Sequence, residues 1–371
     1  MPQDVPRKAL SPVLSTVVVL LACAVVIYLA CEWFTNAVEW LGVRLAVGSA
    51  VVATVLAAAG TALPESVVTL VAVLFGSEES GADVGVGSAL GGPLVVGSIA
   101  YAVAGAVLLV SARSRRARAG AERTRVAASR SGTTPPGSSA AAPGPDPLAG
   151  TDTRALARDQ AWFLGAFALA TGLGLVAFAL KPQLGWVLFG VYALYCWRQV
   201  RTGGPAHAPE DLEPLRLQRR RERPATWAVV AQVVLSLAVV FAASQVFVGQ
   251  LEALAPQLGL PASLVALLLA PVATELPEVL NAVIWARRGK GDLALGNLSG
   301  SMVIQATVPT GLGVLFTGWH LQGPLLLAAG ATALCVAYLL VLFATRRVTP
   351  GRLAAAGGFY AVFALALGVT A

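Results

Sequence analysis

The chain has 371 residues, of which 57% are hydrophobic and only 12% are charged, and its mean hydropathy is +0.74. These values exclude a soluble globular protein and indicate a polytopic membrane protein. The net charge of +7 does not indicate a nucleic-acid-binding protein, because the basic residues lie in loops between apolar runs, which is the distribution of the positive-inside rule.

A helix needs about 20 residues to cross a hydrocarbon core, and ten apolar runs of about this length follow one another along the chain. We predict spans at residues 13–33, 44–75, 85–111, 160–180, 183–198, 225–248, 262–286, 293–317, 322–344 and 352–370. The first run follows Arg7 and Lys8 and so imitates a signal peptide. It continues past Cys23 to Ala30, so we predict a retained span. The four cysteines have no metal-like spacing and are expected to be packing residues.

Two polar segments interrupt the apolar runs. Residues 112–158 are rich in Arg, Ser, Pro and Gly and are predicted to be a disordered basic loop within the first half, and residues 199–224 are predicted to link the two halves. When the loops are assigned alternately to two sides, one side receives all but three of the 26 Lys and Arg residues. We therefore expect this side to be cytoplasmic, both termini to be extracytoplasmic and the protein to lie in the plasma or inner membrane.

A duplicated motif divides the chain into two halves. Thr61-Ala-Leu-Pro-Glu65 and Thr274-Glu-Leu-Pro-Glu278 share the pattern Thr-x-Leu-Pro-Glu, and each is followed by the phrase Asp-x-x-x-Gly-x-x-x-Gly. The halves, residues 1–198 and 225–371, have five predicted spans each. Because five is odd, the second half begins on the opposite side of the membrane, and we predict two inverted repeats. Inverted repeats are typical of secondary transporters with a site at the bilayer midplane.

The repeated motif places carboxylates deep in the membrane. Glu65, Glu275 and Glu278 would together cost on the order of 8 kcal/mol at the bilayer centre on the lenient insertion scales. Such groups require a cation or a proton. The site is therefore expected to hold positive charge.

Uncharged oxygen atoms accompany the carboxylates. Proline cannot donate a helix hydrogen bond, so the carbonyls of Gly60 and Ala273, each four residues before a motif proline, are expected to be free. Thr61 and Thr274 each lie one helical turn before a glutamate, on the same face. Carboxylate, hydroxyl and carbonyl oxygens are the ligands that hard cations such as Ca²⁺ and Na⁺ prefer.

With these motifs the sequence resembles the cation/Ca²⁺ exchanger superfamily, the sodium/calcium exchanger-like membrane proteins. The two α-repeats of that family would correspond to residues 54–100 and 267–313. The resemblance implies an all-α polytopic membrane protein of about ten helices in two inverted five-helix repeats. It also implies a secondary antiporter, not an enzyme, that exchanges Ca²⁺ for Na⁺ by alternating access at a shared carboxylate site. No cofactor is expected, and the partners are inorganic cations and the lipid bilayer.

The resemblance also implies roles for individual residues. Glu65 and Glu278 would be the central cation ligands, with Thr61 and Thr274 beside them. The partner helix of the second repeat presents three further candidate ligands at four-residue steps: Asn297, Ser301 and Gln305. The first repeat departs from the family pattern, because the corresponding positions Gly92 and Val96 offer no side-chain oxygen.

Glu275 stands where the family commonly has Ser, and its role has two possible interpretations. It could replace a ligand lost from the first repeat, or, lying three residues before Glu278, it could carry a proton. An H⁺-coupled antiporter is therefore an alternative to Na⁺/Ca²⁺ exchange. A membrane metalloenzyme is less favoured, because the chain has none of the common metal-site motifs. The hypothesis of a non-transporting cation sensor is supported only by the long polar segment.

Carboxylates outside the motif have structural interpretations. Asp83 and Asp292 each begin a predicted helix and are expected to be N-terminal caps rather than ligands. Glu32, Glu39 and Glu252 lie near span ends, where they could line an ion entrance, although the preferred interpretation is that they face the interface.

Overall fold

The computed structural model describes residues 10–44, 62–113, 148, 150–202 and 212–370, which form helices and connecting turns with no strand among them. The long helices of the first half are α1 (Leu10–Arg44), α4 (Leu63–Phe75), α5 (Gly81–Val95), α7 (Thr153–Leu175) and α8 (Gly185–Thr202). Those of the second half are α9 (Thr226–Leu258), α10 (Ala262–Thr274), α11 (Leu276–Arg287), α12 (Gly291–Gln305), α13 (Val308–Phe316), α14 (Pro324–Ala344), α15 (Pro350–Ala355) and α16 (Gly357–Thr370). The predicted all-α class is confirmed.

The described helices follow the predicted spans. Six helical segments are long and apolar enough to cross a membrane, and the pair α10 and α11, bent by 44°, would be a seventh. After α5 the helix passes through a π-helical turn, η2 (Val96–Ala100), and continues to residue 113. The short 3₁₀ turns η3 (Pro182–Leu184) and η5 (Arg216–Gln218) precede α8 and α9. Residues 45–61 of the second predicted span lie outside the described residues.

Several helices are longer or more divided than predicted. The first span was predicted to end at residue 33, but α1 continues to Arg44, because no Pro or Gly interrupts residues 32–41. The sixth was predicted to end at residue 248, and α9 continues to Leu258, where Gly259 adopts a left-handed conformation with φ of 66°. The eighth predicted span is divided into α12 and α13 just before Pro309, since proline cannot continue the hydrogen-bond ladder.

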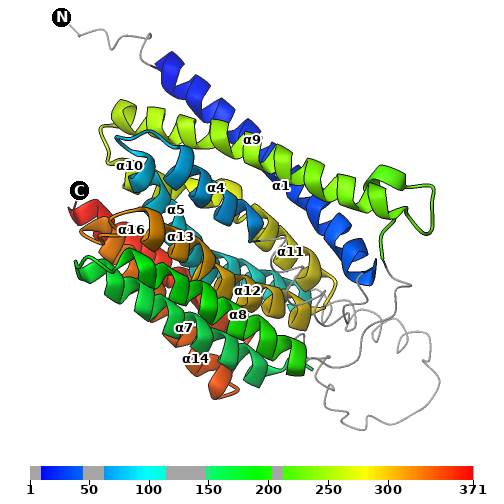
Figure 1. Ribbon diagram of the computed structural model, residues 1–371. Coiled ribbons are helices and arrows are strands. Elements are labelled where there is room, and N and C mark those ends of the chain that lie inside the picture. The colour runs from blue at the N-terminus through cyan, green and yellow to red at the C-terminus, as the bar shows by residue number, and fades with distance from the viewer. Residues whose placement is uncertain (1–9, 45–61, 114–147, 149, 203–211, 371) are drawn as a thin grey trace, which may run out of the picture.

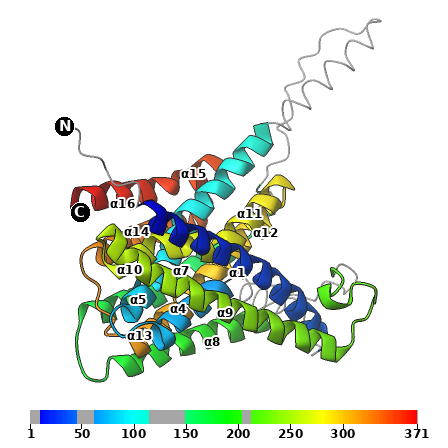
Figure 2. The same ribbon diagram turned by 90° about the horizontal axis from the view of Figure 1, so that it is seen from above.

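The helices form a layered bundle. Helices α1 and α9 lie side by side on one face, α7 and α14 lie on the other, and α4, α5 and α10 to α13 lie between them (Figures 1 and 2). One apolar core joins α1, α4, α9 and α10, and a second joins α5, α7, α12 and α14. Polar residues held between these two cores are therefore remote from bulk water.

Glycines allow α5 and α10 to pack backbone against backbone. A Cβ atom added at Gly91 would lie 2.5 Å from the carbonyl oxygen of Leu267 and 2.7 Å from Cγ of Pro271, and one at Gly87 would lie 3.0 Å from the amide nitrogen of Leu267. No larger residue fits at either position. This contact holds the two middle helices in register.

The outer faces of the bundle are apolar. On α1 the exposed large side chains recur at helical spacing: Leu14, Val18, Leu21, Val25 and Leu29. Exposed apolar side chains of this extent indicate contact with lipid. The four cysteines are free thiols, three of them buried, as expected for packing residues.

Candidate functional site

Glu65 lies in the first turn of α4, at the start of the described part of the second predicted span. Pro64 stands within the first two positions of this helix, where its missing N–H costs nothing. The Glu65 side chain is 1% exposed, and neither carboxylate oxygen has a hydrogen-bond partner among the described residues. A carboxylate at this depth is held near the positive end of the half-helix that it begins.

Gly92 on α5 makes the space that the Glu65 carboxylate occupies. A Cβ atom added at Gly92 would lie 2.7 Å from Oε2 of Glu65 and 2.5 Å from its Cδ. The absence of a side-chain oxygen at this position in the first repeat therefore has a physical reason: the carboxylate of Glu65 lies there instead.

The second motif lies at the break between α10 and α11. Glu275 ends α10 and precedes α11, and Pro277 stands at the start of α11 with Glu278 in its first turn. The buried Ala273 lies four residues before Pro277, so its carbonyl oxygen receives no helix hydrogen bond from that position. Glu65 and Glu278 thus each lie in the first turn of a helix that has proline within its first two positions.

Glu275 is held by two neutral donors. Oγ1 of Thr274 donates a hydrogen bond of 2.7 Å to one carboxylate oxygen, and Nε2 of Gln305 donates one of 2.6 Å to the other. All three side chains are buried. The pairing of Gln305 with Glu275 joins α12 to the end of α10, and it leaves Oε1 of Gln305 buried with no hydrogen-bond partner among the described residues.

The polar face of α12 approaches the same region. Ser301 is buried and donates to the carbonyl oxygen of Leu298 at 3.1 Å, so its lone pairs remain available. Nδ2 of Asn297 is buried and has no hydrogen-bond partner in the described structure. Asn297, Ser301 and Gln305 therefore all lie along α12, and Gln305 contacts the motif carboxylate of Glu275.

The three motif glutamates form one electrostatic unit. The charges of Glu275 and Glu278 both act on the buried carboxylate of Glu65. In the described part of the chain, no three His, Cys, Asp or Glu side chains converge as a metal site. A cation would therefore depend on hydroxyl, amide and carbonyl oxygens as well as carboxylates. The predicted ligands Gly60 and Thr61 lie outside the described residues.

A pocket of about 360 Å³ leads from the surface toward the second motif. Its outer part is lined by three carboxylates, those of Glu32, Glu39 and Glu213, and its inner part reaches Pro277 and Asn297. Glu32 and Glu39, which could line an ion entrance or face the interface, both lie on α1 and line this pocket. Glu252 does not line it, and its Oε1 accepts a 2.8 Å hydrogen bond from the amide of Ser77 instead.

The segment between the two halves closes one side of this pocket. Nδ2 of Asn36 on α1 donates to the carbonyl oxygens of Glu213 and Pro214, at 3.3 and 3.4 Å, and its Oδ1 accepts from the amide of Arg216 at 3.1 Å. Gln232 on α9 donates to the same Oδ1 at 3.1 Å. Arg216 also forms an ion pair of 3.3 Å with Glu32. The linker is thus fixed to both α1 and α9.

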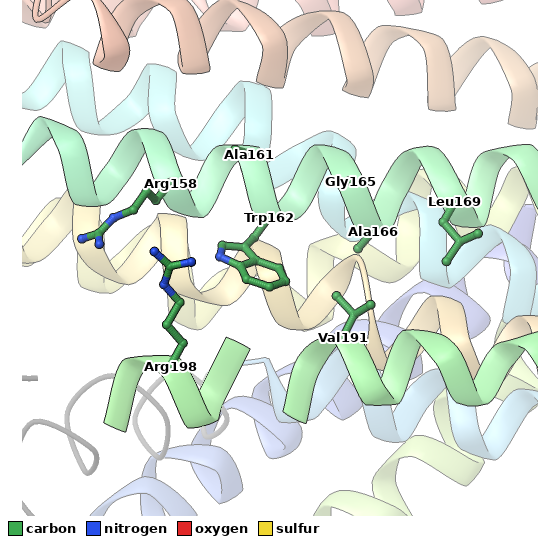
Figure 3. A pocket seen from close by; sticks show the side chains of 8 residues that line it. All are labelled: Arg158, Ala161, Trp162, Gly165, Ala166, Leu169, Val191 and Arg198. Atoms are coloured by element: carbon green, nitrogen blue, oxygen red, sulfur yellow. The ribbon is translucent and has the colours of Figure 1, made fainter. Parts of the chain in front are cut away.

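A separate groove of about 460 Å³ runs between α7 and α8 (Figure 3). Arg158, Trp162 and Arg198 lie at one end, and small and apolar side chains line the rest. None of the motif glutamates lines this groove. Its size therefore does not identify it as the site of the predicted chemistry.

Two of the sequence expectations need correction, and two residues were missed. Asp83 and Asp292 lie in the first turns of α5 and α12 but do not cap them, because the cap positions are Ser80 and Lys290. Both aspartates are exposed, so the prediction that they are not ligands agrees with their position. The two missed residues are Thr69 and Ser88, whose hydroxyl groups are buried near Glu65. The register of the duplication could have found one of them, Ser88, because it corresponds to Asn297.

Comparisons with known proteins give a consistent picture. The family model described as sodium/calcium exchanger protein matches residues 15–201 and 228–370. The chain is 34% identical over 134 residues to the putative antiporter CaxA of Alkalimonas amylolytica, an alignment that covers 35% of this chain and 39% of that protein. It is 37% identical over 84 residues to the sodium/calcium exchanger MaX1 of Methanosarcina acetivorans, which covers 23% and 24%. The alignments thus span well under half the length of either relative.

Solved structures share the fold. The sodium-calcium exchanger NCX_Mj superposes with a TM-score of 0.54 at 17% identity, over 94% of this chain and 98% of that one. The H⁺/Ca²⁺ exchanger CAX superposes with a TM-score of 0.58 at 17% identity, over 96% and 86%. Because these identities are low, the likeness establishes the arrangement of helices and not the transported ions.

Proposed function

Because this chain belongs to the sodium/calcium exchanger protein family, we propose that it is a secondary antiporter that exchanges Ca²⁺ for Na⁺ by alternating access. The observation that carries the proposal is the pair of motif glutamates. Glu65 and Glu278 are both fully buried, and both lie in the first turn of a helix, directly after a proline. Glu65 has two carboxylate oxygens without a hydrogen-bond partner in the described structure. A bound cation supplies the charge that these groups require.

The proposed ligands come from both repeats. Glu65 and Glu278 are the central ligands, with Thr61, Gly60 and Ala273 contributing hydroxyl or carbonyl oxygens from the motif. Ser301 and Asn297 belong to the same set on α12. Thr274 and Gln305 act through Glu275, whose carboxylate they hold at 2.7 and 2.6 Å. Glu275 is then a positioned third carboxylate that offsets the oxygen ligands missing from α5.

Exchange follows from the charge of the site. Several uncompensated carboxylates cross a low-dielectric barrier at high cost, whereas the same groups loaded with cations approach neutrality. Only loaded forms change sides. Because both ions use the same carboxylates, they exclude one another, and one ion moves only in exchange for the other.

The pocket beside the linker is the proposed entrance on one side. Its outer carboxylates attract cations, and its inner end lies at Pro277, next to Glu278 in the sequence. The basic segments on this side support a cytoplasmic location. We accordingly propose a multi-pass protein of the plasma or inner membrane with both termini outside.

The proposed inverted repeat accounts for the helix pairing. Under a two-fold relation between residues 1–198 and 225–371, α1 is the counterpart of α9, and α7 of α14. Each of these pairs is in contact. The contact of α4 with α5 likewise has a counterpart in the contact of α11 with α12. The pairing supports the division of the chain into these two halves.

Proton coupling on the same scaffold is the second candidate. It is favoured by Glu275, a third carboxylate buried three residues before Glu278. A proton on one of the three glutamates would replace Na⁺ as the counter-ion. The two candidates differ only in the ion that returns.

The test is Ca²⁺ uptake into proteoliposomes that hold an outward gradient of Na⁺ or, separately, of H⁺. We expect uptake on the Na⁺ gradient that is abolished by Glu278→Gln, because the variant keeps the shape of the side chain and loses its charge. Uptake on the proton gradient alone supports the second candidate. Uptake on neither gradient contradicts calcium antiport.

A further inference from the structure

Most buried hydroxyls of this protein donate to a carbonyl oxygen of their own helix. Ser236, Thr307, Thr310 and Thr332 do so at 2.6 to 2.8 Å. This is the usual way for Ser and Thr to satisfy their hydroxyl groups in a membrane helix. Hydroxyls that do not follow it require another partner.

Two of the exceptions lie beside Glu65. Thr69 is 0% exposed and Ser88 is 1% exposed, yet neither oxygen has a hydrogen-bond partner among the described residues. Residues near them on α4 and α5, Val68, Val71 and Val84, belong to a buried apolar core. An unsatisfied hydroxyl in such surroundings costs about 1 to 3 kcal/mol. The pair is therefore unusual for the chain and calls for a ligand.

The contacts between α4 and α5 bring Thr69 and Ser88 to the same level. The two helices are antiparallel: added Cβ atoms would meet Glu65 from Gly92, Val73 from Gly85, and Gly76 from Gly81. In this register Thr69, one turn after Glu65, lies opposite Ser88, one turn before Gly92. Both hydroxyls therefore lie on the contact line, next to the carboxylate.

The duplication gives an independent reason to single out Ser88. Its counterpart in the second repeat is Asn297, because the phrases that begin at Asp83 and Asp292 align residue by residue. Asn297 also has a buried polar atom with no hydrogen-bond partner in the described structure. The first repeat, which lacks a side-chain oxygen at Gly92 and Val96, has one at Ser88, one turn before Gly92 on α5.

A third such hydroxyl lies on a helix that packs against both α4 and α5. Ser244 on α9 is 0% exposed and has no hydrogen-bond partner among the described residues. Glu252 on α9 accepts a hydrogen bond from Ser77 at the end of α4. The ring of Phe75 on α4 also packs against Phe241 on α9 at 5.4 Å, so α4 lies against the stretch of α9 between residues 241 and 252, which contains Ser244.

We propose that Glu65, Thr69 and Ser88 form a binding position for a dehydrated monovalent cation of the size of Na⁺, and that Ser244 lies on the helix that covers it. The proposal rests on the antiport function proposed above and names where its coupling ion binds. One carboxylate balances one positive charge, and neutral hydroxyls complete an oxygen shell of the kind that hard cations prefer. The carboxylate and hydroxyls make no hydrogen bonds to one another, as expected of oxygens that share a cation rather than a proton.

The experiment uses Thr69→Val, Ser88→Ala and the double variant in proteoliposomes. Two activities are measured: self-exchange of labelled Ca²⁺, which needs no coupling ion, and the dependence of Ca²⁺ uptake on internal Na⁺. We expect the Na⁺ concentration for half-maximal uptake to rise about tenfold, the effect of losing one good ligand, and the Hill coefficient for Na⁺ to fall by about one. Self-exchange stays measurable.

Matched controls are Ser98→Ala, on the same continuous helix as Ser88, and Thr332→Val on α14. Both hydroxyls donate to a carbonyl of their own helix, so the Na⁺ dependence should not change. The inference is overturned if the test variants keep self-exchange and show the same Na⁺ dependence as the unmodified protein. The two hydroxyl groups would then bind water or serve packing alone. Self-exchange without any Na⁺ response in the unmodified protein overturns it too and leaves antiport intact. Absence of self-exchange in the unmodified protein contradicts the proposed function itself.

The effect of Na⁺ on thermal stability tests the proposed binding position without a transport assay. In detergent, NaCl should raise the melting temperature of the unmodified protein relative to choline chloride, because a ligand that binds only the folded state stabilises it. The double variant should lose this difference, and the two controls should keep it. An equal Na⁺ effect in the double variant overturns the proposal.

Discussion

At the scale of single residues, the contact between Glu65 and Gly92 predicts a severe effect from one methyl group. In Gly92→Ala the new Cβ would lie 2.7 Å from Oε2 of Glu65, so the carboxylate must leave its position. We expect the affinity for Ca²⁺ to fall at least about tenfold, since a cation ligand is displaced by about an ångström. Ca²⁺ uptake as a function of its concentration measures this loss.

The control for this variant is Gly249→Ala on α9, where an added Cβ meets nothing within 4 Å. It should transport normally, and both variants should reach the membrane in similar amounts, because alanine favours helix formation over glycine. Normal Ca²⁺ affinity in Gly92→Ala would show that the Glu65 carboxylate is not a ligand in this position.

Sequence alone predicted some residues of the site and not others. Glu65 and Glu278 follow from a repeated motif at bilayer depth, where charge is too costly to be incidental. The hydrogen bond from Gln305 to Glu275 could not be predicted, because the residues are 30 positions apart and their contact depends on how α12 meets the end of α10. Thr69 has no counterpart in the motif, and only the packing of α4 on α5 brings it to the site.

At the scale of elements, the fixed linker gives a prediction about the chain between the halves. Asn36 holds the linker through three hydrogen bonds, and Asn36→Ala leaves those backbone groups without this partner, at a cost of about 1 to 3 kcal/mol for each group that stays buried. The basic run Arg219 to Arg221 should then open more often. We expect trypsin to cut there about tenfold faster, measured by gel and mass spectrometry.

The control is Gln250→Ala, far from the linker on the other end of α9. Its cleavage rate should match that of the unmodified protein. An equal rate in Asn36→Ala would mean that Gln232 and Leu215, which is fully buried, hold the linker without the asparagine.

The existence of the helices was more predictable than their ends. Apolar runs of about 20 residues identify spans, and every predicted run contains a described helix. Hydropathy fails where a helix leaves the bilayer but finds other partners: the last turns of α1 carry Glu32, Asn36 and Glu39, which the linker and the pocket accommodate. The break after α12 was missed because residues 293–317 are apolar enough to be taken as one span, although Pro309 marks the start of a second helix.

At the scale of the whole molecule, the acidic pocket predicts a salt-dependent affinity on one side only. Glu39→Gln removes one of three carboxylates from the entrance, so we expect the KM for Ca²⁺ presented from the linker side to rise about threefold at low ionic strength. At about 1 M salt, where the Debye length is about 3 Å, the difference should vanish. The maximal rate should not change.

Sidedness and charge are both controlled in this experiment. Glu78→Gln makes the same charge change in the exposed turn before α5, outside the pocket, and should leave this KM unaltered. A KM shift in Glu39→Gln that survives high salt would assign Glu39 to direct ligation instead of attraction at the entrance.

The all-helical membrane fold was predictable from the succession of apolar runs, whereas the inversion of the two halves, which an odd number of spans in each implies, stays a prediction. The unequal chemistry of the halves was visible only in part. Sequence comparison found the missing oxygens at Gly92 and Val96, whereas the structure adds that the Glu65 carboxylate lies against Gly92 and that Gln305 is engaged by Glu275.

This inequality bears on the energy of the two access states. In a strictly symmetric inverted repeat, each repeat takes one of two conformations, and the inward-open and outward-open forms differ only in which repeat takes which. The two forms then have the same free energy. Here α12 offers amide and hydroxyl groups where α5 offers glycine and valine, so the forms are not equivalent. The empty transporter should rest mostly on one side of the membrane and hold the same ion with different affinities on its two faces.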